Sequence, residues 1–354
     1  MNPLAIDVLV IGAGPAGTAA ARAAAGKGLT VICVDRRAEV GVPVQCAEFV
    51  PMPLLRTVHE TGSRVQDIEG MLTVLPSGLQ HHSVFPGMMI DRARFDQGLA
   101  ELAQAAGAQV EMRCQFLAWD GAVARLRRGT EEEFAVRPRL LIGADGPHSL
   151  VAEAMGLPHQ QVVYTRQYTV PLLRPYADTD IFLSDAFPGG YGWLFPRGPV
   201  ANLGLGADRR FEDNLKLPLE QLHRQMVERG IIGEAVLGRT GGAIPVGGIR
   251  LMVRGNVVLA GDAAGLTHPI TGAGIPAAVI SGEGAGLAAA DYLAGDGDAL
   301  ESYAEDMQDQ FGPALARAVQ RRKSLEAVWR RQPAAQEDRV MRSGWIAFDE
   351  YYAA

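Results

Sequence analysis

The stretch Val8-Leu-Val-Ile11-Gly12-Ala-Gly14-Pro-Ala-Gly17 decides the fold of this chain. Its four apolar residues are typical of a buried parallel strand, and the alanine-rich segment that follows Gly17 favours a helix. Between them, Gly12 permits a tight turn, Gly14 lets a pyrophosphate approach the backbone, and Gly17 lets the helix pack closely on the strand. The unpaired N–H groups at the start of the helix then face the phosphates. The motif therefore predicts an α/β fold with a Rossmann-type domain that binds a dinucleotide.

A second apolar run, Leu29–Val34, leads directly to Asp35 and Arg36. A carboxylate at the end of the second strand can accept hydrogen bonds from the ribose hydroxyls of the adenosine half. We therefore expect Asp35, with Arg36 beside it, to contribute to the dinucleotide site. The alternative is a strand–helix turn without a ligand, but the strand, the helix and the acid all stand where a binding site needs them.

The composition is that of an ordinary globular protein. The chain has 354 residues, 48% of them hydrophobic and 21% charged, with a net charge of −7. The acidic balance argues against a nucleic-acid partner, and no uncharged apolar run is long enough to span a membrane. Cys33, Cys46 and Cys114 form no metal-binding spacing, which suits a reducing compartment. Because the first strand begins almost at the first residue, we expect no signal peptide and a cytoplasmic protein.

Two later segments repeat the pattern of a buried strand that ends in a glycine and an aspartate. The first is LLIGADG at 140–146, which precedes a short helix. The second is VVLAGD at 257–262, which leads through PITGAG at 269–274 into a long helix expected over 275–293. A lone glycine motif does not separate NAD from FAD, so these segments decide which dinucleotide is expected.

In this order the three motifs resemble those of the group A flavoproteins, the family that contains p-hydroxybenzoate hydroxylase and geranylgeranyl reductase. The resemblance spans roughly residues 5–295 and implies that the dinucleotide is FAD. It implies that Asp262 binds the ribitol chain and that Arg92 lies near the cofactor. Asp145 either lies near the cofactor or only shapes its turn. The residues that the resemblance places along the pyrimidine edge of the isoalloxazine or just before it are Pro269, Gly272, Ala273 and Gly274.

A glycine-rich helix start beside the flavin has a physical reason. Reduced flavin carries negative charge near N1 and the C2 carbonyl, where N–H donors and the helix dipole stabilise it. Glycines allow the close backbone approach that this requires. The alternative for Asp262 is a helix cap without a ligand. Its position between a buried strand and Ala263-Ala-Gly265 favours FAD.

Strand-like segments replace the alternation of strands and helices between residues 162 and 246. They indicate a mainly antiparallel sheet, joined by strands at 71–75 and 84–90, that is inserted in the FAD-binding domain and covers the flavin. A pocket is expected at the junction, where ligand sites often form. The expected division is an FAD-binding domain of residues 1–70, 88–160 and 250–295, a substrate domain of residues 71–87 and 161–249, and C-terminal helices over 296–354.

Three aromatic residues, Tyr191, Trp193 and Phe195, alternate along one expected strand of the second sheet. Alternate side chains of a strand share a face, so the stripe forms either a wall of the substrate pocket or a part of the hydrophobic core. The segment resembles the Tyr-x-Trp-x-Phe-Pro motif of geranylgeranyl reductases, which is followed there by an Asn-x-Gly-x-Gly strand, here 202–206. The resemblance implies that these side chains line the substrate cavity.

Cys46, Glu48 and His268 are the candidate catalytic residues. Cys46 lies in the loop where archaeal geranylgeranyl reductases carry a cysteine near the flavin, so it either tunes the flavin, donates a proton, or is a small buried residue. Glu48 is a candidate proton relay, and His268 is a candidate contact of flavin or substrate. Because no acid or thiol stands at ligand spacing from the histidines, no metal site is expected.

The sequence leaves the reaction open. With no second strand–glycine–helix unit, NADH or NADPH is expected to reduce the flavin transiently. In one alternative, reduced FAD and oxygen hydroxylate an aromatic substrate, either a small molecule or a side chain of a partner protein. In the other, hydride passes to a carbon–carbon double bond of an isoprenoid lipid. A short tail, and Gly272-Ala273-Gly274 in place of Gly-Glu-Gly, favour hydroxylation over the geranylgeranyl reductase reaction. A non-catalytic flavin-binding module is the third alternative.

The segment 314–331 reads as a basic amphipathic helix. Such a helix either lies on a membrane surface or packs on the FAD-binding domain with its charges in water. The packed arrangement is favoured, and peripheral contact with a membrane stays open.

Overall fold

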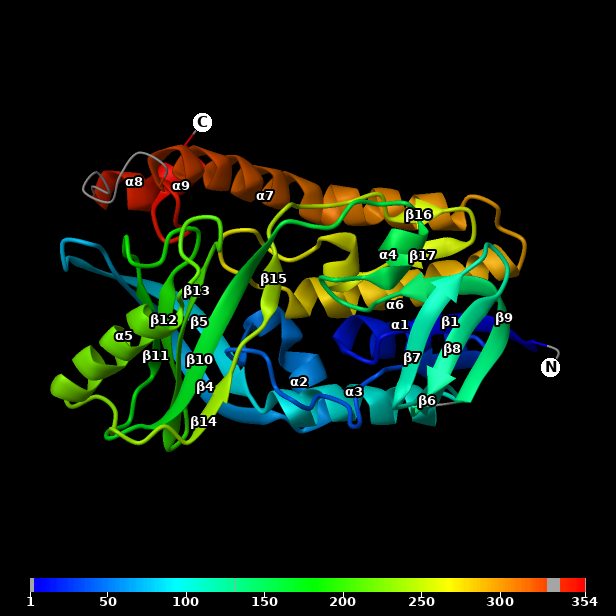
Figure 1. Ribbon diagram of the computed structural model, residues 1–354, viewed down its shortest axis with the longest axis horizontal. Helices are drawn as coiled ribbons and strands as arrows, with labels where there is room; N and C mark the ends of the chain where they lie inside the picture. The colour runs from blue at the N-terminus through cyan, green and yellow to red at the C-terminus, as the bar shows by residue number, and fades with distance from the viewer. Residues whose placement is uncertain (1–2, 131, 330–337, 354) are drawn as a thin grey trace.

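The computed structural model describes residues 3–130, 132–329 and 338–353 and places two β-sheets side by side along its long axis (Figure 1). The strands of the first sheet are β1 (Leu4–Ile11), β2 (Val31–Val34), β6 (Gln109–Glu111), β9 (Glu132–Gly143), β16 (Val253–Arg254) and β17 (Val257–Leu259). They follow the order β16-β17-β9-β1-β2-β6, and a hairpin of β7 (Cys114–Trp119) and β8 (Ala124–Arg128) pairs with β9. Because β1 pairs in parallel with both β2 and β9, the sheet has the Rossmann-type arrangement that the glycine motif predicts.

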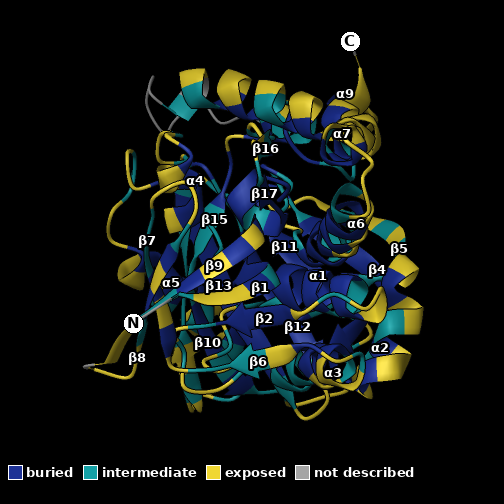
Figure 2. Ribbon diagram, turned by 90° about the vertical axis from the view of Figure 1, so that its right-hand side faces the viewer, coloured by how far each residue is buried: buried dark blue, intermediate teal, exposed yellow. Residues whose placement is uncertain are grey.

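The helices around the first sheet pack on one another through small residues. Those that cover the sheet are α1 (Pro15–Gly26), α3 (Arg92–Ala105), α6 (Ile275–Leu293) and α7 (Ala299–Trp329), with α2 (Leu55–Thr61) and α4 (Leu150–Ala154) as shorter helices. A Cβ on Gly282 would lie 2.1 Å from the carbonyl oxygen of Ala16, and one on Gly286 would lie 2.3 Å from that of Ala20. Only glycine therefore lets α6 approach α1 this closely. In Figure 2, α1 and β1 are largely buried, whereas much of α7 is exposed.

The second sheet is mainly antiparallel. Its strands are β3 (Phe49–Pro51), β4 (Arg64–Val74), β5 (Gln80–Ile90), β10 (Val162–Pro171), β11 (Asp178–Phe182), β12 (Gly192–Arg197), β13 (Val200–Ala207), β14 (Gly238–Thr240) and β15 (Ala243–Pro245). They follow the order β14-β10-β13-β12-β11-β4-β5-β3, with β15 also on β10, and only β11 and β4 pair in parallel. One face packs on α5 (Lys216–Glu228), and the opposite face packs on residues of α8 (Asp338–Ser343) and of the segment that leads to α9 (Asp349–Tyr352).

The elements expected from sequence are largely present, with two corrections at their bounds. The helix expected over 275–293 is α6, with the same bounds. The helix expected over 314–331 is the second half of α7, which begins at Ala299 and runs through Pro313, because buried Tyr303 and Met307 pack it on the first core. Residues 330 and 331 of that expected helix lie outside the described part of the chain. The expected domain boundaries at 70/71 and 87/88 fall inside β4 and β5, because these strands pair along most of their length.

None of the helices in the described ranges combines the length and apolar character that crossing a bilayer requires.

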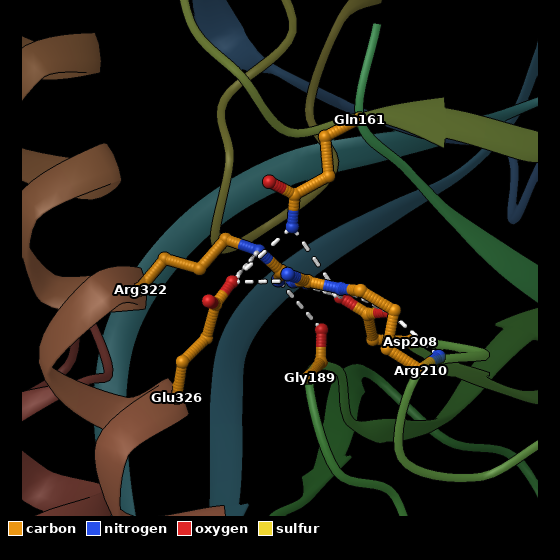
Figure 3. A network of polar contacts seen from close by, with 6 residues as sticks. All are labelled: Gln161, Gly189, Asp208, Arg210, Arg322 and Glu326. Atoms are coloured by element: carbon orange, nitrogen blue, oxygen red, sulfur yellow. Dashed lines mark hydrogen bonds and ion pairs between the residues drawn. The ribbon is translucent and has the colours of Figure 1, made fainter.

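A buried polar network ties α7 to the second sheet (Figure 3). Arg322, only 3% exposed, donates to the Gly189 carbonyl at 2.7 Å and to Asp208 at 2.9 Å. Arg210 pairs with the same carboxylate at 2.7 Å and with Glu326 of α7 at 2.6 Å. Although burial raises the pKa of Asp208, its hydrogen bonds with Arg210 and the charge of Arg322 hold that pKa below the ordinary value. The carboxylate therefore stays ionised and anchors both arginines.

Replacing Arg322 by alanine is expected to lower the free energy of unfolding by about 3 kcal/mol, because it removes one partner of a buried ion pair. Chemical denaturation of the purified protein measures this change. The matched control is Lys323→Ala, which removes an exposed cation from the next position of the same helix and is expected to shift stability by less than about 0.5 kcal/mol. Equal stability of the two variants would contradict the assignment of Arg322 as an anchor.

Candidate functional site

Three turns meet at the carboxyl edge of the first sheet. β1, β9 and β17 are neighbouring parallel strands, and they end directly before Gly12, before the 144–146 turn and before the turn that holds Asp262. Because parallel strands end at the same edge of a sheet, segments more than a hundred residues apart come together there. This edge is the site that the three sequence motifs predict.

The glycine turn after β1 shows why these positions need glycine. Gly12 has φ +104°, and a Cβ on it would lie 2.3 Å from the carbonyl oxygen of Ala144. A Cβ on Gly17 would lie 1.7 Å from the carbonyl oxygen of Gly12, so this residue sets the contact between helix and turn. No atom lies within 4 Å of the Cβ position of Gly14. The backbone beside Gly14 is therefore open to a pyrophosphate, and the turn fits the phosphates of FAD.

Asp35 lies against this turn. One carboxylate oxygen accepts a hydrogen bond from the Ala13 N–H at 2.9 Å, and the other accepts one from the Arg37 N–H at 2.8 Å. Arg36 is exposed. The carboxylate thus stands next to the phosphate-binding turn, and ribose binding by Asp35 and Arg36 stays a prediction.

Asp145 shapes its turn, and its proximity to the cofactor stays a prediction. One oxygen accepts from the N–H groups of Leu150 and Val151 at 2.8 and 3.2 Å, so it caps the start of α4. The other oxygen is buried and has no hydrogen-bond partner among the described residues. Burial raises the pKa of the carboxyl group, which the hydrogen bonds only partly offset. An unpaired buried oxygen at this edge is a feature that a polar cofactor group would satisfy.

Asp262 forms one unit with the loop of residues 267–274, which is called the flavin-side loop below. The Thr267 hydroxyl donates to Asp262 Oδ1 at 2.5 Å, and a Cβ on Gly274 would lie 3.2 Å from the same oxygen. The loop is closed by two backbone bonds, from the His268 N–H to the Ala273 carbonyl and from the Gly272 N–H to the His268 carbonyl, both at 2.9 Å. Pro269 is buried inside it. The unit places an aspartate directly beside the start of α6, as the resemblance implies for a ribitol ligand.

Arg92 and Cys46 lie together between the two sheets. Arg92 donates to both oxygens of Asp96, at 2.7 and 3.2 Å. Although burial lowers the pKa of Arg92, the Asp96 carboxylate raises it above its ordinary value. Burial raises the pKa of the Cys46 thiol, and the Arg92 guanidinium offsets only part of that rise. Cys46 is therefore a protonated thiol at neutral pH, and its sulfur can hold a proton for transfer.

Glu48 joins helix α3 to two strands of the second sheet. Its side chain is buried, and the residue has φ 71°, a left-handed conformation that a non-glycine residue adopts only under constraint. One carboxylate oxygen accepts from the Arg92 N–H at 3.0 Å. The other accepts from the Asn202 amide at 2.8 Å and forms an ion pair with Arg197 at 3.3 Å. Since both oxygens are occupied, the contacts favour a positioning role over the expected proton relay.

The aromatic stripe, which consists of Tyr191, Trp193 and Phe195, connects the loop that holds Cys46 with the flavin-side loop. Trp193 and Phe195 are 6% and 8% exposed and share a face of β12, whereas Leu194 points to the α5 side. The Trp193 indole donates to the Gln167 side chain at 3.0 Å, and that side chain donates to the Cys46 carbonyl at 3.1 Å. The Tyr191 hydroxyl donates to the Thr271 carbonyl at 2.5 Å. The stripe therefore belongs to a packed core that also borders the site.

Sequence reasoning missed a set of aromatic residues from the last described segment. The Trp345 ring lies 4.8 Å from that of Tyr191, and its indole donates to the Thr73 hydroxyl at 3.2 Å. The Tyr351 hydroxyl lies 3.3 Å from His268 Nε2. No motif marks these residues, and the only available signal was the density of aromatic residues in 345–352.

His268 is held as a neutral imidazole. Its Nδ1 accepts from the Thr271 and Ile270 N–H groups at 3.2 and 3.4 Å, so the proton is on Nε2, which donates to the Tyr351 oxygen. Burial lowers the pKa of His268 to about 4. Protonation of Nδ1 would place a new N–H against two backbone N–H groups. His268 therefore holds no additional proton at neutral pH and is a poor acid there. Within the described residues, no group of three or more His, Cys, Asp or Glu side chains could hold a metal ion.

Known proteins with similar sequences and structures extend this result. The FAD binding domain family matches residues 5–170. Digeranylgeranylglycerophospholipid reductase 1 of Methanopyrus kandleri is 36% identical, and the match covers 86% of this chain and 85% of that protein. A geranylgeranyl bacteriochlorophyll reductase-like protein from Thermoplasma acidophilum superposes with a TM-score of 0.86 at 26% identity, over 98% of this chain and 93% of that one. Aklavinone-11 hydroxylase, at 22% identity and a TM-score of 0.71, shares the fold alone.

Fold and site together define an FAD-dependent oxidoreductase with the group A flavoprotein fold. Within that class, the chain belongs to the geranylgeranyl reductase family, whose relatives here include the digeranylgeranylglycerophospholipid reductases.

Replacing Asp262 by alanine is expected to weaken FAD binding about tenfold or more, because it would remove the carboxylate that we expect to hydrogen-bond the ribitol chain. The ratio of flavin absorbance to protein absorbance, and titration of the apoprotein with FAD, measure the change. The control is Glu283→Ala, which removes an exposed carboxylate from α6 and is expected to leave the flavin content unchanged. Full flavin content in the Asp262 variant would contradict the assignment.

The depressed pKa of His268 predicts a loss of stability in acid. The unfolded chain binds a proton below about pH 6.5, whereas the folded protein binds it only near pH 4, so the contribution of this group is complete above 6.5 and disappears as pH falls toward 4. The loss amounts to about 3 kcal/mol. It is measured as the free energy of unfolding across this range, and His268→Gln is expected to show a correspondingly smaller loss. The exposed His59→Gln serves as control, and identical pH profiles for all three proteins would refute the assignment.

Proposed function

We propose that this protein reduces carbon–carbon double bonds of an isoprenoid lipid, with NADH or NADPH as the transient electron donor. The observation that carries the proposal is its similarity, over 86% of its length, to a digeranylgeranylglycerophospholipid reductase. Reduction is therefore the preferred reaction. It replaces hydroxylation, which the short tail and the missing glutamate favoured in the sequence. A substrate with an extended apolar chain also suits the aromatic face described above.

The site supplies what such a reduction needs beside the cofactor. Saturating a double bond takes a hydride, which FAD reduced by NADH or NADPH would supply when bound, and a proton for the neighbouring carbon. The protonated Cys46 sulfur is the proton source, since burial keeps the thiol neutral. The Glu48 N–H donates to that sulfur at 3.2 Å and fixes its position. Arg92 lies close enough to stabilise the thiolate that remains after transfer.

The chain departs from other geranylgeranyl reductases in its short tail and in the missing glutamate. Both departures are compatible with this chemistry. The 338–352 segment, through Trp345, covers the aromatic face beside the flavin-side loop. Ala273 replaces the usual glutamate, and its carbonyl closes the loop through His268. We therefore infer that Trp345 borders the substrate and that the loop keeps its shape without a carboxylate.

The deciding experiment reduces the FAD-loaded protein without oxygen and then adds a geranylgeranyl lipid. Reoxidation of the flavin with formation of a saturated product is expected. Cys46→Ser should slow this step about a hundredfold, because serine keeps the position but is a far weaker acid. The control Cys114→Ser alters a buried thiol in β7 of the first sheet and should react at the normal rate.

One result would overturn the proposed reaction, and a second would overturn only the role given to Cys46. The first is a flavin that the lipid never reoxidises, together with incorporation of labelled oxygen into an aromatic substrate, which would favour hydroxylation. The second is a normal rate in Cys46→Ser at full flavin content, which would exclude the thiol as proton source while leaving the reductase reaction in place.

A further inference from the structure

A basic pocket of about 380 Å³ opens on the second sheet, outside the site described above. β10, β14 and the loop that leads into α5 form its walls. Four of its lining residues are cations and one is an acid, Asp213; the cations are Arg166, Arg209, Lys216 and Arg239. In a chain with a net charge of −7, this concentration of positive charge stands out as a site for an anion.

The arginines of the pocket are oriented but not neutralised. Arg209 lies over the Tyr164 ring at 3.8 Å, and Arg239 lies over the Tyr168 ring at 5.5 Å. Neither arginine, nor Arg166, forms an ion pair with a carboxylate in the described part of the chain. Cation–π contacts of this kind hold a guanidinium in place while its N–H groups stay available to a ligand.

The buried network of Figure 3 explains how one wall is built. Asp208 and Arg210 are both engaged with α7, so the loop between β13 and α5 is fixed at these two positions. Arg209 lies between them and is left to face the pocket. On the opposite wall, the Thr240 hydroxyl donates to the Val44 carbonyl at 2.6 Å, which anchors β14.

Arg166 and Arg239 of the pocket lie on the opposite face of the sheet from Gln167, whereas Thr165 and Thr240, which also line the pocket, share the Gln167 face at the edge of the sheet. Arg166 and Gln167 are neighbours on β10, so their side chains point to opposite faces. Gln167 contacts Trp193 and the Cys46 loop, whereas Arg166 lines the pocket.

Exposed leucines flank the cations along the chain. Leu217, 56% exposed, follows Lys216, and Leu237, 60% exposed, precedes β14 and its Arg239. Lys216 pairs with Glu220 at 3.6 Å, whereas Arg239 forms no ion pair in the described part of the chain. Exposed apolar side chains beside cations are typical of surfaces that contact both the headgroups and the outermost acyl region of a membrane. The combination favours a lipid headgroup over a free anion, which would gain nothing from the leucines.

We propose that this pocket binds the phosphate of an anionic phospholipid headgroup and docks the protein on a membrane surface, with Leu217 and Leu237 in the interface. The protein as a whole is repelled by an anionic surface, and salt screens that repulsion beyond about 10 Å, so the local cations decide the contact. The proposal goes beyond the proposed function, because it does not depend on which bond the flavin reduces.

Cosedimentation of the FAD-loaded protein with vesicles tests the proposal. Binding is expected to phosphatidylcholine vesicles that contain phosphatidylglycerol, and not to phosphatidylcholine alone. The double variant Arg166→Gln/Arg239→Gln should lower the partition coefficient about thirtyfold, as the loss of two interfacial cations implies. The control, Arg125→Gln/Arg137→Gln, removes the same charge from exposed positions of the first sheet and should bind like the wild type.

Two further arms identify the source of the anion. Leu217→Ser/Leu237→Ser keeps every cation and is expected to weaken vesicle binding as well. Inorganic phosphate alone is expected to raise the melting temperature little, and no more in the wild type than in the arginine variant.

The proposal fails if the wild type does not bind the anionic vesicles, or if the control loses as much binding as the pocket variant. It also fails if inorganic phosphate raises the melting temperature of the wild type but not of the arginine variant while the protein does not bind the vesicles. Flavin content and anaerobic reoxidation by a detergent-solubilised lipid report on the reductase reaction separately. Failure of docking with normal reoxidation, or the reverse, therefore distinguishes this proposal from the proposed function.

Discussion

The buried carboxylate of Glu48 is the constraint on which the geometry of the site depends. It receives a backbone N–H from the start of α3, an amide from β13 and a guanidinium from β12, so a helix of the FAD-binding half and two strands of the second sheet meet on two oxygen atoms. Leaving the carboxylate or the Asn202 amide unpaired in the interior would cost more than the hydrogen bond contributes, so these contacts are expected to form together. The left-handed backbone at Glu48 is the local cost of this arrangement. Two residues earlier, Cys46 is thereby held beside Arg92, where burial keeps its thiol protonated.

The second sheet has two different faces, and each has its own partner. Toward the flavin side, the aromatic stripe of β12 packs with Trp345 and Phe348 and contacts the flavin-side loop through Tyr191. Toward the other side, α5 covers the leucines of β12 and β13, and the basic pocket opens at the edge of that layer. The strict alternation of side chains along a strand is what separates an apolar catalytic face from a charged outer face only one residue away. The proposed lipid reduction and the proposed membrane docking would use different faces of this sheet, without a separate domain.

α7 connects these functions across the molecule. Its first half packs on α6 in the FAD-binding half, and its second half carries Arg322 and Glu326 into the network that fixes the 208–210 loop. From the same helix, Arg321 donates to the Tyr351 carbonyl at 3.0 Å and so holds the segment whose hydroxyl reaches His268. One helix thus sets the position of the pocket wall, of the covering aromatic segment and, through α6, of the flavin-side loop. The basic residues that made this helix resemble a membrane-binding element are in part internal anchors.

The sequence by itself determined the cofactor half of this protein. Strands, turns and glycines at 8–17, 140–146 and 257–274 act through local propensity and through the φ values that glycine accepts easily, so they predicted a dinucleotide site at one edge of the sheet. Their order predicted FAD through its resemblance to that of the group A flavoproteins. It also indicated the second sheet, although pairing carried β4 and β5 past the expected boundaries. The tertiary structure alone set the contacts at the candidate site, which are the tie at Glu48, the contact of Tyr191 with Thr271 and the cover by Trp345. It also brought together the arginines of the pocket. The contacts at the candidate site join residues that are 44 to 272 positions apart. No period or motif encodes such pairs, because they arise when separately formed elements bury their surfaces against each other.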